Sequence, residues 1–406
     1  MSPAGSFESV MAAIQGGAAS IYFGAGNLNM RAKSSNNFSI NNIKDIVQIC
    51  KENNVKTYLT VNTIIYDEEV DTLKEILSAA KEFEVDAIIA SDLAVIMQAY
   101  EIGVLIHLST QLNITNYEAV KYFSKFADVI VLARELTLEK IKYICDKIKE
   151  DDLRGPAGEL IQIEVFIHGA LCMAVSGKCY LSLHEKNHSA NRGACLQTCR
   201  RSYSVTDIET GNELEIDNKF IMSPKDLCTL PFIDKIIEAG ATVLKIEGRG
   251  RSPEYVKTVT QTYHKAIELI NEGKFDEENI EILTNKLRTV FNRDFWGGYY
   301  LGKTMGEWSN RYGSQATTKK IQIGKVNKYY SNIKVAAIKL ESDEVNIGDQ
   351  LLFIGPTTGV VEHSVESLRV NDNIVEKSIK GDEFSIQLDT KLRPNDKVFK
   401  IVPIER

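Results

Sequence analysis

The chain has 406 residues, 44% hydrophobic and 25% charged, which are the proportions of an ordinary globular protein with one large domain and a smaller one. Its net charge of −7 argues against a general nucleic-acid coat, although it allows a local basic face. No apolar run approaches the roughly 18 residues of a membrane span, and no signal pattern opens the chain, so we expect a cytoplasmic protein without a membrane segment.

Short apolar runs alternate with amphipathic helical patterns, such as those over 41–53 and 71–84. This alternation predicts a buried parallel sheet with crossover helices. Seven or eight such units fit a TIM-like (β/α) barrel better than a doubly wound sheet. The predicted strands are 20–24, 57–62, 87–90, 105–109, 129–133, 161–167, 220–223 and 242–248.

The start of the chain carries a strand-to-helix turn and a helix in "MSPAGSFESVMAAIQGGA", with almost no strand before them. Either the barrel lacks most of its first strand, or Met1 is an internal methionine of a longer chain. We favour the second interpretation.

The pattern changes after a polar linker over 306–320. From Ile321 onward, short strands separated by Gly, Asp and Asn turns predict a small antiparallel β-barrel over 321–406, similar to those of translation factors. A purely structural cap is the alternative. The barrel domain is then 1–305, with a cysteine-rich insert over about 168–228.

Polar side chains follow many of the predicted strands, where a TIM barrel places its active site. They predict a polar pocket, although charged strand ends also cap helices and pair with one another. The candidates for catalysis are His168, Lys225, Asp226 and Glu247, and His168 is equally compatible with a structural role. The candidates for substrate binding are Arg31, Asn62, Gln111, Arg134, Glu135 and Arg249.

Basic residues cluster in the second half of the large domain and are compatible with RNA phosphates or with a solvated surface. The candidates for RNA binding are Arg200, Arg201, Arg293 and Arg311. Aromatic residues in "FWGGYY" and "RRSY" fit either stacking on an extruded base or packing between domains.

Five cysteines follow the spacing C-x6-C-x15-C-x3-C-x28-C: Cys172, Cys179, Cys195, Cys199 and Cys228. Thiolates suit zinc and iron–sulfur clusters, and the absence of a C-x2-C knuckle disfavours a zinc ribbon. We favour an iron–sulfur cluster over zinc, and incidental cysteines come third. Cys50 and Cys145 occupy apolar positions of helical patterns and are expected in the core.

The segment "HEKNH" (184–188) matches the zinc-protease pattern H-E-x-x-H, which needs a helix to bring both histidines to one face. Its neighbours favour turns, and it lacks an apolar face. We therefore disfavour a catalytic zinc site here.

The segment "EVFIHGALCMAVSGKCYLS" (164–182) satisfies the signature of the collagenase-like peptidase family 32 of the unassigned (U) type. The blocks "SANRGACLQTCRRSY", "SPKDLC", "KIEGRGRS" and "FNRDFWGGYYLGK" resemble further parts of this family, so the resemblance covers most of the chain. Family members normally begin with a strand before "PAG". The counterpart of HEKNH is not implied to be a metal site.

The resemblance implies an oxygen-independent hydroxylation protein with a 4Fe–4S cluster, held by Cys172, Cys179, Cys195 and Cys228, with Cys199 as a possible substitute. Branches of the family modify transfer RNA uridine, ribosomal RNA cytidine or ubiquinone precursors. The chain most resembles the transfer RNA branch, which forms 5-hydroxyuridine at the wobble position with prephenate as the small dicarboxylate donor. The ubiquinone branch lacks the appended small barrel. The alternatives are hydroxylation of another RNA, a peptidase, and a non-enzymatic scaffold with a structural cluster.

Overall fold

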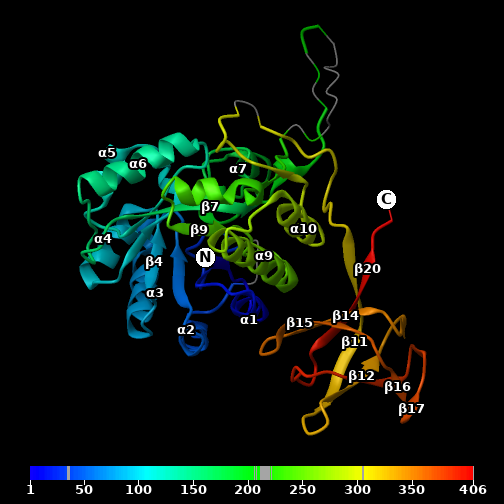
Figure 1. Ribbon diagram of the computed structural model, residues 1–406. Helices are drawn as coiled ribbons and strands as arrows, with labels where there is room; N and C mark the ends of the chain where they lie inside the picture. The colour runs from blue at the N-terminus through cyan, green and yellow to red at the C-terminus, as the bar shows by residue number, and fades with distance from the viewer. Residues whose placement is uncertain are drawn as a thin grey trace.

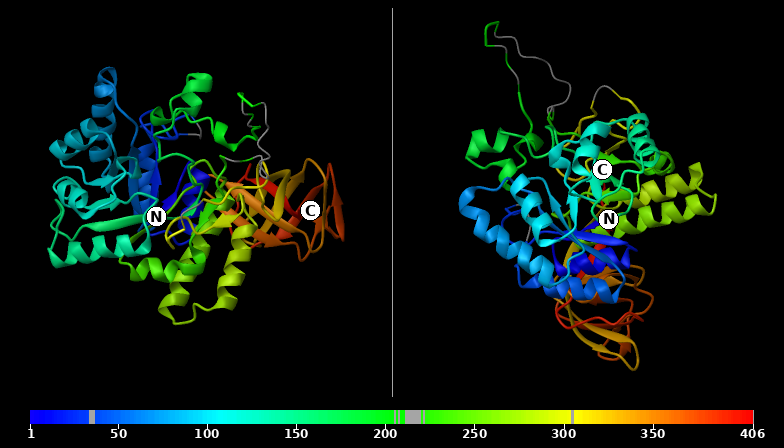
Figure 2. Two further views of the ribbon diagram at one scale, coloured as in Figure 1. Left: turned by 90° about the horizontal axis from the view of Figure 1, so that it is seen from above. Right: turned by 90° about the vertical axis from the view of Figure 1, so that its left-hand side faces the viewer.

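The computed structural model describes residues 1–33, 37–204, 206, 208–210, 220, 222–303 and 306–405. A large α/β unit carries the N-terminus, and a smaller β unit lies to one side of it and ends in the last strand (Figures 1 and 2). None of the helices in these ranges is long and apolar enough to cross a membrane.

The large unit is built on parallel strands that pair in chain order, each with the next, as the sequence predicts. The series is β1 (Ser2–Pro3), β2 (Ser20–Phe23), β3 (Lys56–Val61), β4 (Ala87–Ala90), β5 (Ile106–Leu108), β6 (Val129–Val131), β7 (Gln162–Gly169) and β9 (Val243–Ile246).

The two ends of this parallel series are joined by backbone hydrogen bonds at Met1. The Met1 amine donates to the Leu244 carbonyl over 2.8 Å, and the Ile246 N–H donates to the Met1 carbonyl over 3.1 Å. A closed barrel requires bonds between its first and last strands, such as these. Closure into a TIM-like barrel stays a prediction. Two short strands extend the sheet outside the series: β8 (Asp226–Cys228) lies antiparallel to β7, and β10 (Phe295–Trp296) lies parallel to β8.

Most predicted strands are confirmed, with ends that differ by one or two residues. The strand predicted over 220–223 is wrong at the residues of this range that the structure describes. Phe220 and Met222 lie in turns and Ile221 lies outside the described residues, while the nearby strand begins only at Asp226.

The helices form where the sequence supplies caps and a single apolar face. In α2, the buried residues Ile43, Ile46, Val47 and Cys50 recur at the steps of one helix face. The helices are α1 (Phe7–Gln15), α2 (Asn42–Glu52), α3 (Val70–Glu82), α4 (Leu93–Ile102), α5 (Tyr117–Phe123), α6 (Leu138–Glu150), α7 (Leu181–Lys186), α8 (Ile233–Glu238), α9 (Pro253–Asn271) and α10 (Glu277–Arg288). Short 3-10 turns lie at η1 (Asp67–Glu69), η2 (Thr110–Leu112), η3 (Ala190–Arg192), η4 (Thr198–Arg200) and η5 (Leu230–Phe232).

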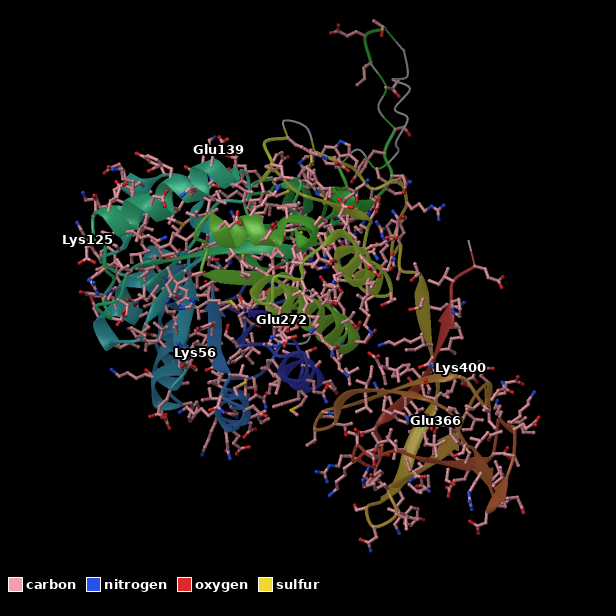
Figure 3. The ribbon with its side chains drawn as sticks, viewed as in Figure 1. Lys56, Lys125, Glu139, Glu272, Glu366 and Lys400 are labelled. Carbon is pink, nitrogen blue, oxygen red and sulfur yellow. The ribbon has the colours of Figure 1, made fainter. Side chains whose placement is uncertain are left out.

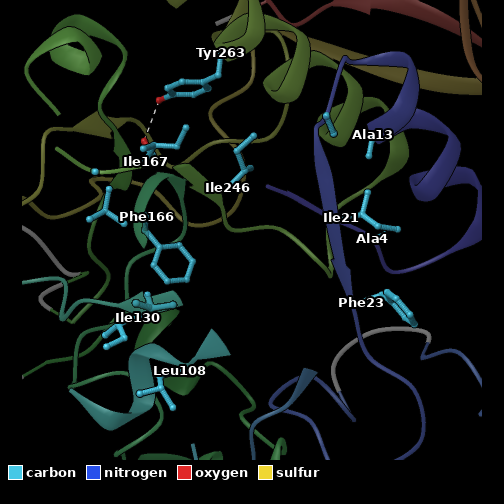
Figure 4. Close-up of a cluster of buried hydrophobic side chains, with 14 of the residues drawn as sticks. Ala4, Ala13, Ile21, Phe23, Leu108, Ile130, Phe166, Ile167, Ile246 and Tyr263 are labelled. Carbon is cyan, nitrogen blue, oxygen red and sulfur yellow. Dashed lines mark hydrogen bonds between the residues drawn. The ribbon is translucent and has the colours of Figure 1, made fainter. Parts of the chain in front are cut away.

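Apolar side chains from neighbouring strands fill the space between sheet and helices. Leu108, Ile130 and Ile167 come from β5, β6 and β7, and the Tyr263 hydroxyl of α9 donates to the Ile167 carbonyl over 2.9 Å (Figure 4). Charged side chains such as Lys125 and Glu139 lie instead on the exposed outer surface (Figure 3). Cys50 and Cys145 are buried in the core, as predicted.

The smaller unit consists of antiparallel strands with a hydrophobic core of its own, centred on Phe353 and Phe384. Its main sheet has the order β15-β14-β20-β11-β12-β19-β16-β17, and β13 pairs with β18. The strands are β11 (Thr318–Tyr330), β12 (Val335–Leu340), β13 (Glu344–Asn346), β14 (Gln350–Gly355), β15 (Gly359–Ser364), β16 (Arg369–Val370), β17 (Asn373–Ile374), β18 (Lys377–Ile379), β19 (Glu383–Gln387) and β20 (Lys397–Pro403). The predicted division at 305 falls beside residues 304–305, which lie outside the described residues.

The two units are in direct contact through the turn before β15 and the start of that strand. The Gln15 side chain of α1 donates to the Thr358 carbonyl and accepts from the Val360 N–H, both over 2.8 Å. Lys257 of α9 donates to the Val360 carbonyl over 2.9 Å. The small unit therefore hydrogen-bonds to α1 and α9, the helices that follow β1 and β9.

The turn before α1 packs so tightly on the loop after β9 that Gly5 has no room for a side chain. A Cβ atom at Gly5 would lie 2.1 Å from the Arg249 carbonyl oxygen. Gly5→Ala should therefore lower the free energy of unfolding by about 1–3 kcal/mol, the usual range for overpacking. Urea denaturation measures this, with Gly306→Ala as the control, because a Cβ there meets its nearest atom at an ordinary 3.6 Å. Equal stability of the two variants would contradict the close approach.

Candidate functional site

A cavity of about 220 Å³ lies at the carboxyl ends of the parallel strands, where the sequence predicts a polar pocket. We call it the first cavity. Five of the six predicted substrate-binding residues line it, whereas Glu135 is exposed and does not. Its polar lining includes Tyr22, Arg31, Thr60, Asn62, Gln111, Arg134, Lys245, Glu247 and Arg249.

Glu247, one residue past β9, is the carboxylate of the first cavity and was predicted as a catalytic residue. Its Oε1 accepts from Arg31 Nη2 over 2.8 Å, and its Oε2 accepts from the Tyr22 hydroxyl over 3.4 Å. Burial alone would raise its pKa, but the charges of Arg31 and Arg134 outweigh this and lower the pKa of Glu247 to about 2. Glu247 is therefore ionised at neutral pH and is a poor general acid.

Arg249 and Arg134, whose charges also act on this carboxylate, are each held by fixed partners. Arg249 is 6% exposed and donates to Thr60 Oγ1 over 2.6 Å and to Asn29 Oδ1 over 3.2 Å. Burial lowers the pKa of Arg249 to about 10. Arg134 stacks on the Phe166 ring at 3.8 Å and donates to the Ala170 carbonyl over 3.0 Å. Its Nε is buried and has no hydrogen-bond partner among the described residues.

Two amides from separate strands complete one wall of the first cavity. Asn62 Nδ2 donates to Gln111 Oε1 over 3.3 Å, and the Met30 N–H donates to Asn62 Oδ1 over 3.2 Å. The structure thus brings together Asn62 and Gln111, two predicted substrate-binding residues that follow β3 and β5.

Sequence reasoning missed a buried charge network that continues below the first cavity. Lys245 of β9 is 4% exposed and pairs with Glu164 of β7, whose side chain is fully buried, with Nζ and Oε1 2.6 Å apart. Glu164 Oε2 lies 4.0 Å from His107 Nδ1, and neither atom has a hydrogen-bond partner within the described part of the chain. The signal was a charged residue between apolar ones in each predicted strand, Glu164 in "IQIEVFI" and Lys245 in "TVLKIEG".

Four cysteines line the first cavity: Cys172, Cys179, Cys195 and Cys199. Burial raises the pKa of the Cys199 thiol, and the nearby cysteines add to the rise. Cys228 lies elsewhere, buried in β8 with its sulfur 3.8 Å from the Tyr263 hydroxyl. Burial raises the pKa of Cys228 to about 11. The structure thus places Cys199, rather than Cys228, beside the other three.

The chemistry of these thiols fits an iron–sulfur cluster. Four cysteine thiolates are the usual ligand set of a 4Fe–4S cluster. Across the described residues, no three His, Cys, Asp or Glu side chains converge closely enough to hold a single metal ion. The cysteine-rich segment packs on the loop after β2, since a Cβ at Gly193 would lie 2.3 Å from the Asn29 carbonyl oxygen.

The other three predicted catalytic residues do not line the first cavity. His168 is buried between Tyr255, Tyr263 and Phe295, with Nδ1 3.3 Å from the Tyr263 hydroxyl. Lys225 pairs with Asp294 at 3.0 Å and with Glu307 at 3.2 Å. Asp226 is buried beside Arg293.

A second cavity adjoins the first and contains all four predicted RNA-binding arginines, Arg200, Arg201, Arg293 and Arg311. Its lining also includes Lys33, Arg251, Phe291 and Tyr312, which sequence reasoning did not assign to a site. Cys195, Gln197, Arg200 and Arg251 line both cavities.

The HEKNH segment does not form the helix face that a zinc protease needs. Helix α7 contains His184 but ends at Lys186, because Asn187 adopts a left-handed φ of 53°. His188 lies beyond this end, and its Nδ1 is 2.5 Å from the Lys186 carbonyl. The two histidines therefore do not share one helix face.

Residues 5–310 match the model of peptidase family U32. A protein of Porphyromonas gingivalis named collagenase is 54% identical over 400 residues, which cover 98% of this chain and 97% of that protein. The tRNA hydroxylation protein P1 of Bacillus subtilis is 32% identical over 379 residues, which cover 91% of this chain and 86% of that protein. A 23S rRNA 5-hydroxycytidine synthase of Escherichia coli is 34% identical and covers 68% of this chain and 40% of its own.

The buried histidines predict a specific loss of stability in mild acid. Burial lowers the pKa of both His107 and His168 to about 3, whereas an unfolded histidine titrates near about 6.5. Between these values the unfolded chain binds more protons, so the free energy of unfolding falls as the pH is lowered, by about 1.4 kcal/mol per pH unit for each histidine. His107→Phe should remove one of the two contributions between about pH 6.5 and 5.

Urea denaturation at several pH values measures this slope. His184→Ala, which removes an exposed ring, is the control and should keep the wild-type slope. A wild-type slope in His107→Phe would contradict a neutral buried His107.

Proposed function

Because the chain belongs to peptidase family U32, we propose that it is an iron–sulfur enzyme that hydroxylates RNA, with the wobble uridine of transfer RNA as its substrate and 5-hydroxyuridine as its product. The supporting observation is that four thiols and a surplus of buried cations face the same cavity at the carboxyl ends of the strands. In this proposal the parallel strands close into a TIM-like barrel, whose active sites lie on that face. Relatives named for tRNA and rRNA hydroxylation support the substrate class.

In this proposal Cys172, Cys179, Cys195 and Cys199 hold a 4Fe–4S cluster, because they are the four cysteines of the first cavity. When bound, such a cluster supplies electron-transfer chemistry. The enzyme would act in the cytoplasm, where thiols stay reduced. The protein's own contribution is to place the thiols beside the cationic wall.

The cationic wall fits a dicarboxylate donor such as prephenate. Its cations are Arg31, Arg134, Lys245 and Arg249, together with Arg200 and Arg251, which also line the second cavity. Arg31 pairs with Glu247 and Lys245 pairs with Glu164. Arg134 and Arg249 form no ion pair with a carboxylate among the described residues, and buried charges are stable only when paired. Guanidinium groups match carboxylates with two parallel hydrogen bonds, so a ligand with two carboxylates balances the site.

A peptidase is the second candidate, because the 54% identical relative is named collagenase. Hydrolysis of a peptide needs a nucleophile with a nearby base, or a metal-activated water. No histidine lines the first cavity within the described part of the chain, and the histidines of HEKNH do not share a helix face. The geometry therefore favours the hydroxylase.

The position of the cysteines predicts which of them hold iron. Cys199→Ala should lose most of the iron and the brown absorbance of the anaerobically purified protein, since it removes one of four ligands. Cys228→Ala is the matched control and should retain both, because Cys228 lies in β8 against Tyr263. Iron that is lost from Cys228→Ala and kept by Cys199→Ala would move the fourth ligand to Cys228.

Restoration of the modification tests the function itself. In a strain lacking the gene, the wild-type chain should restore 5-hydroxyuridine in transfer RNA, measured by mass spectrometry of nucleosides. Arg134→Ala should reduce this by roughly ten- to a hundredfold, the effect of losing a charge-assisted hydrogen bond. Glu135→Ala, at the exposed neighbouring position, is the control and should restore it fully.

Two outcomes would contradict the proposal. Full restoration by Arg134→Ala would remove this residue from the site. Failure of the wild-type chain to restore hydroxyuridine, together with cleavage of collagen peptides by the purified protein, would favour the peptidase.

A further inference from the structure

The second cavity has more positive charge around it than its described neighbours balance. Arg200, Arg251 and Arg293 line its inner part, and no carboxylate lines it among the residues that the structure describes. The carboxylate in contact with this group is Asp226, which lies behind the cavity wall and is 2% exposed.

Asp226 is shared between two of these arginines. Its Oδ1 lies 3.3 Å from Arg293 Nη1, and its Oδ2 accepts from the Arg293 N–H over 3.2 Å. Arg251 Nη2 lies farther away, 3.9 Å from Oδ2. One carboxylate thus faces two guanidinium groups, and its better contacts are with Arg293.

Among the described residues, Arg200 donates hydrogen bonds to neutral acceptors only. It donates to the Pro224 carbonyl over 2.7 Å, to Ser223 Oγ over 3.2 Å, and to the Leu171 carbonyl. Burial lowers the pKa of Arg200, and the charge of Arg293 lowers it further. The group therefore keeps a surplus of positive charge in a partly buried place, which an anionic ligand would neutralise.

Aromatic rings hold the guanidinium groups in place and reach to the rim. Arg251 and Arg293 lie over the Phe291 ring, at 3.6 Å and 5.1 Å from its centroid. Tyr312 at the rim is 74% exposed, and Arg311 beside it is also exposed. An exposed ring next to fixed cations is the arrangement that binds single-stranded nucleic acid, by stacking and by phosphate contacts.

The two cavities share a wall formed by Cys195, Gln197, Arg200 and Arg251. A ligand in the second cavity is therefore next to the thiols and the cationic wall of the first. Because a base is covalently joined to the backbone phosphates on either side, a nucleotide can occupy both places at once.

We propose that the second cavity is a phosphate site that binds an RNA backbone phosphate at or beside the modified nucleotide, with Arg251, Arg293 and Arg200 as its floor and Arg311 and Tyr312 at its rim. This inference rests on the proposed RNA substrate and adds the place where the backbone is held. Arginine forks match phosphate oxygens with paired hydrogen bonds. The exposed rim favours a backbone phosphate of a longer chain over free phosphate, because a polymer can continue past Arg311 to solvent.

The test is the salt dependence of transfer RNA binding, measured by fluorescence anisotropy between about 50 and 200 mM KCl. Arg251→Gln and Arg311→Gln should each weaken binding by about five- to tenfold at low salt and reduce the slope of log Kd against log[KCl] by about 1, since each removes a phosphate contact. Arg154→Gln is the matched control, because Arg154 pairs with Asp152 on the exposed surface away from both cavities. It should keep the wild-type affinity and slope.

Because Arg311 is exposed, Arg311→Gln tests the site without removing a buried contact. All variants should keep the wild-type urea midpoint and iron content. If the wild-type chain binds transfer RNA, and Arg251→Gln and Arg311→Gln both keep its affinity and salt slope, the phosphate site alone is overturned. Inorganic phosphate that binds the wild type but not Arg251→Gln, with RNA binding unaffected, would assign the site to free phosphate and also overturn the proposal. A wild-type chain that binds no transfer RNA would overturn the proposed function together with this site.

Discussion

The ion pair between Glu247 and Arg31 is the contact on which the candidate site depends. Glu247 follows β9 and Arg31 belongs to the loop after β2, so their 2.8 Å contact joins segments 216 residues apart in the chain. The carboxylate also reduces the repulsion among Arg31, Arg134 and Arg249, whose charges would otherwise oppose one another at short range. Loss of Glu247 would therefore affect the whole cationic wall.

The same loop supports the cysteine-rich segment. The Lys33 N–H donates to the Gly193 carbonyl over 3.3 Å, and Gly193 lies against Asn29 with no room for a side chain. Asn29 in turn accepts from Arg249, so the arginine wall and the cysteine segment are positioned by one short loop. This arrangement explains why two chemically different groups, cations and thiols, face one cavity.

Surplus positive charge is the common property of the two cavities. In the first, Arg134 and Arg249 form no ion pair with a carboxylate among the described residues. In the second, Asp226 is shared by Arg251 and Arg293, while Arg200 donates to neutral acceptors. Placing like charges together without a ligand lowers stability, and proteins retain such arrangements mainly at functional sites. Fixed partners such as Phe166 and Phe291 keep the guanidinium groups oriented before an anion binds.

The sequence predicted the parts of the site that follow the regular strand–helix alternation. Asn62, Gln111, Arg134 and Glu247 follow parallel strands, so their meeting at one edge of the sheet could be inferred from order alone. Lys225 and Asp226 do not reach this edge of the sheet. The strand expected before them, over 220–223, does not form at the described residues of that range, and β8 runs antiparallel to β7.

Other features depend on contacts between distant segments and could not be inferred. The spacing of the cysteines does not reveal that buried Cys228 contacts Tyr263, which lies 35 residues later. Nor does it reveal that Lys245 and Glu164, in strands far apart in the chain, are paired side by side in the sheet interior. Such pairings follow from the register of β7 and β9, which the local pattern does not determine.

The most direct test of the proposed 4Fe–4S cluster is the metal and sulfide content of the wild-type chain after anaerobic purification. Such a cluster predicts roughly four irons and four acid-labile sulfides per chain, with little zinc. About one zinc per chain without sulfide would contradict it, and so would a chain that binds neither metal after reconstitution with iron and sulfide.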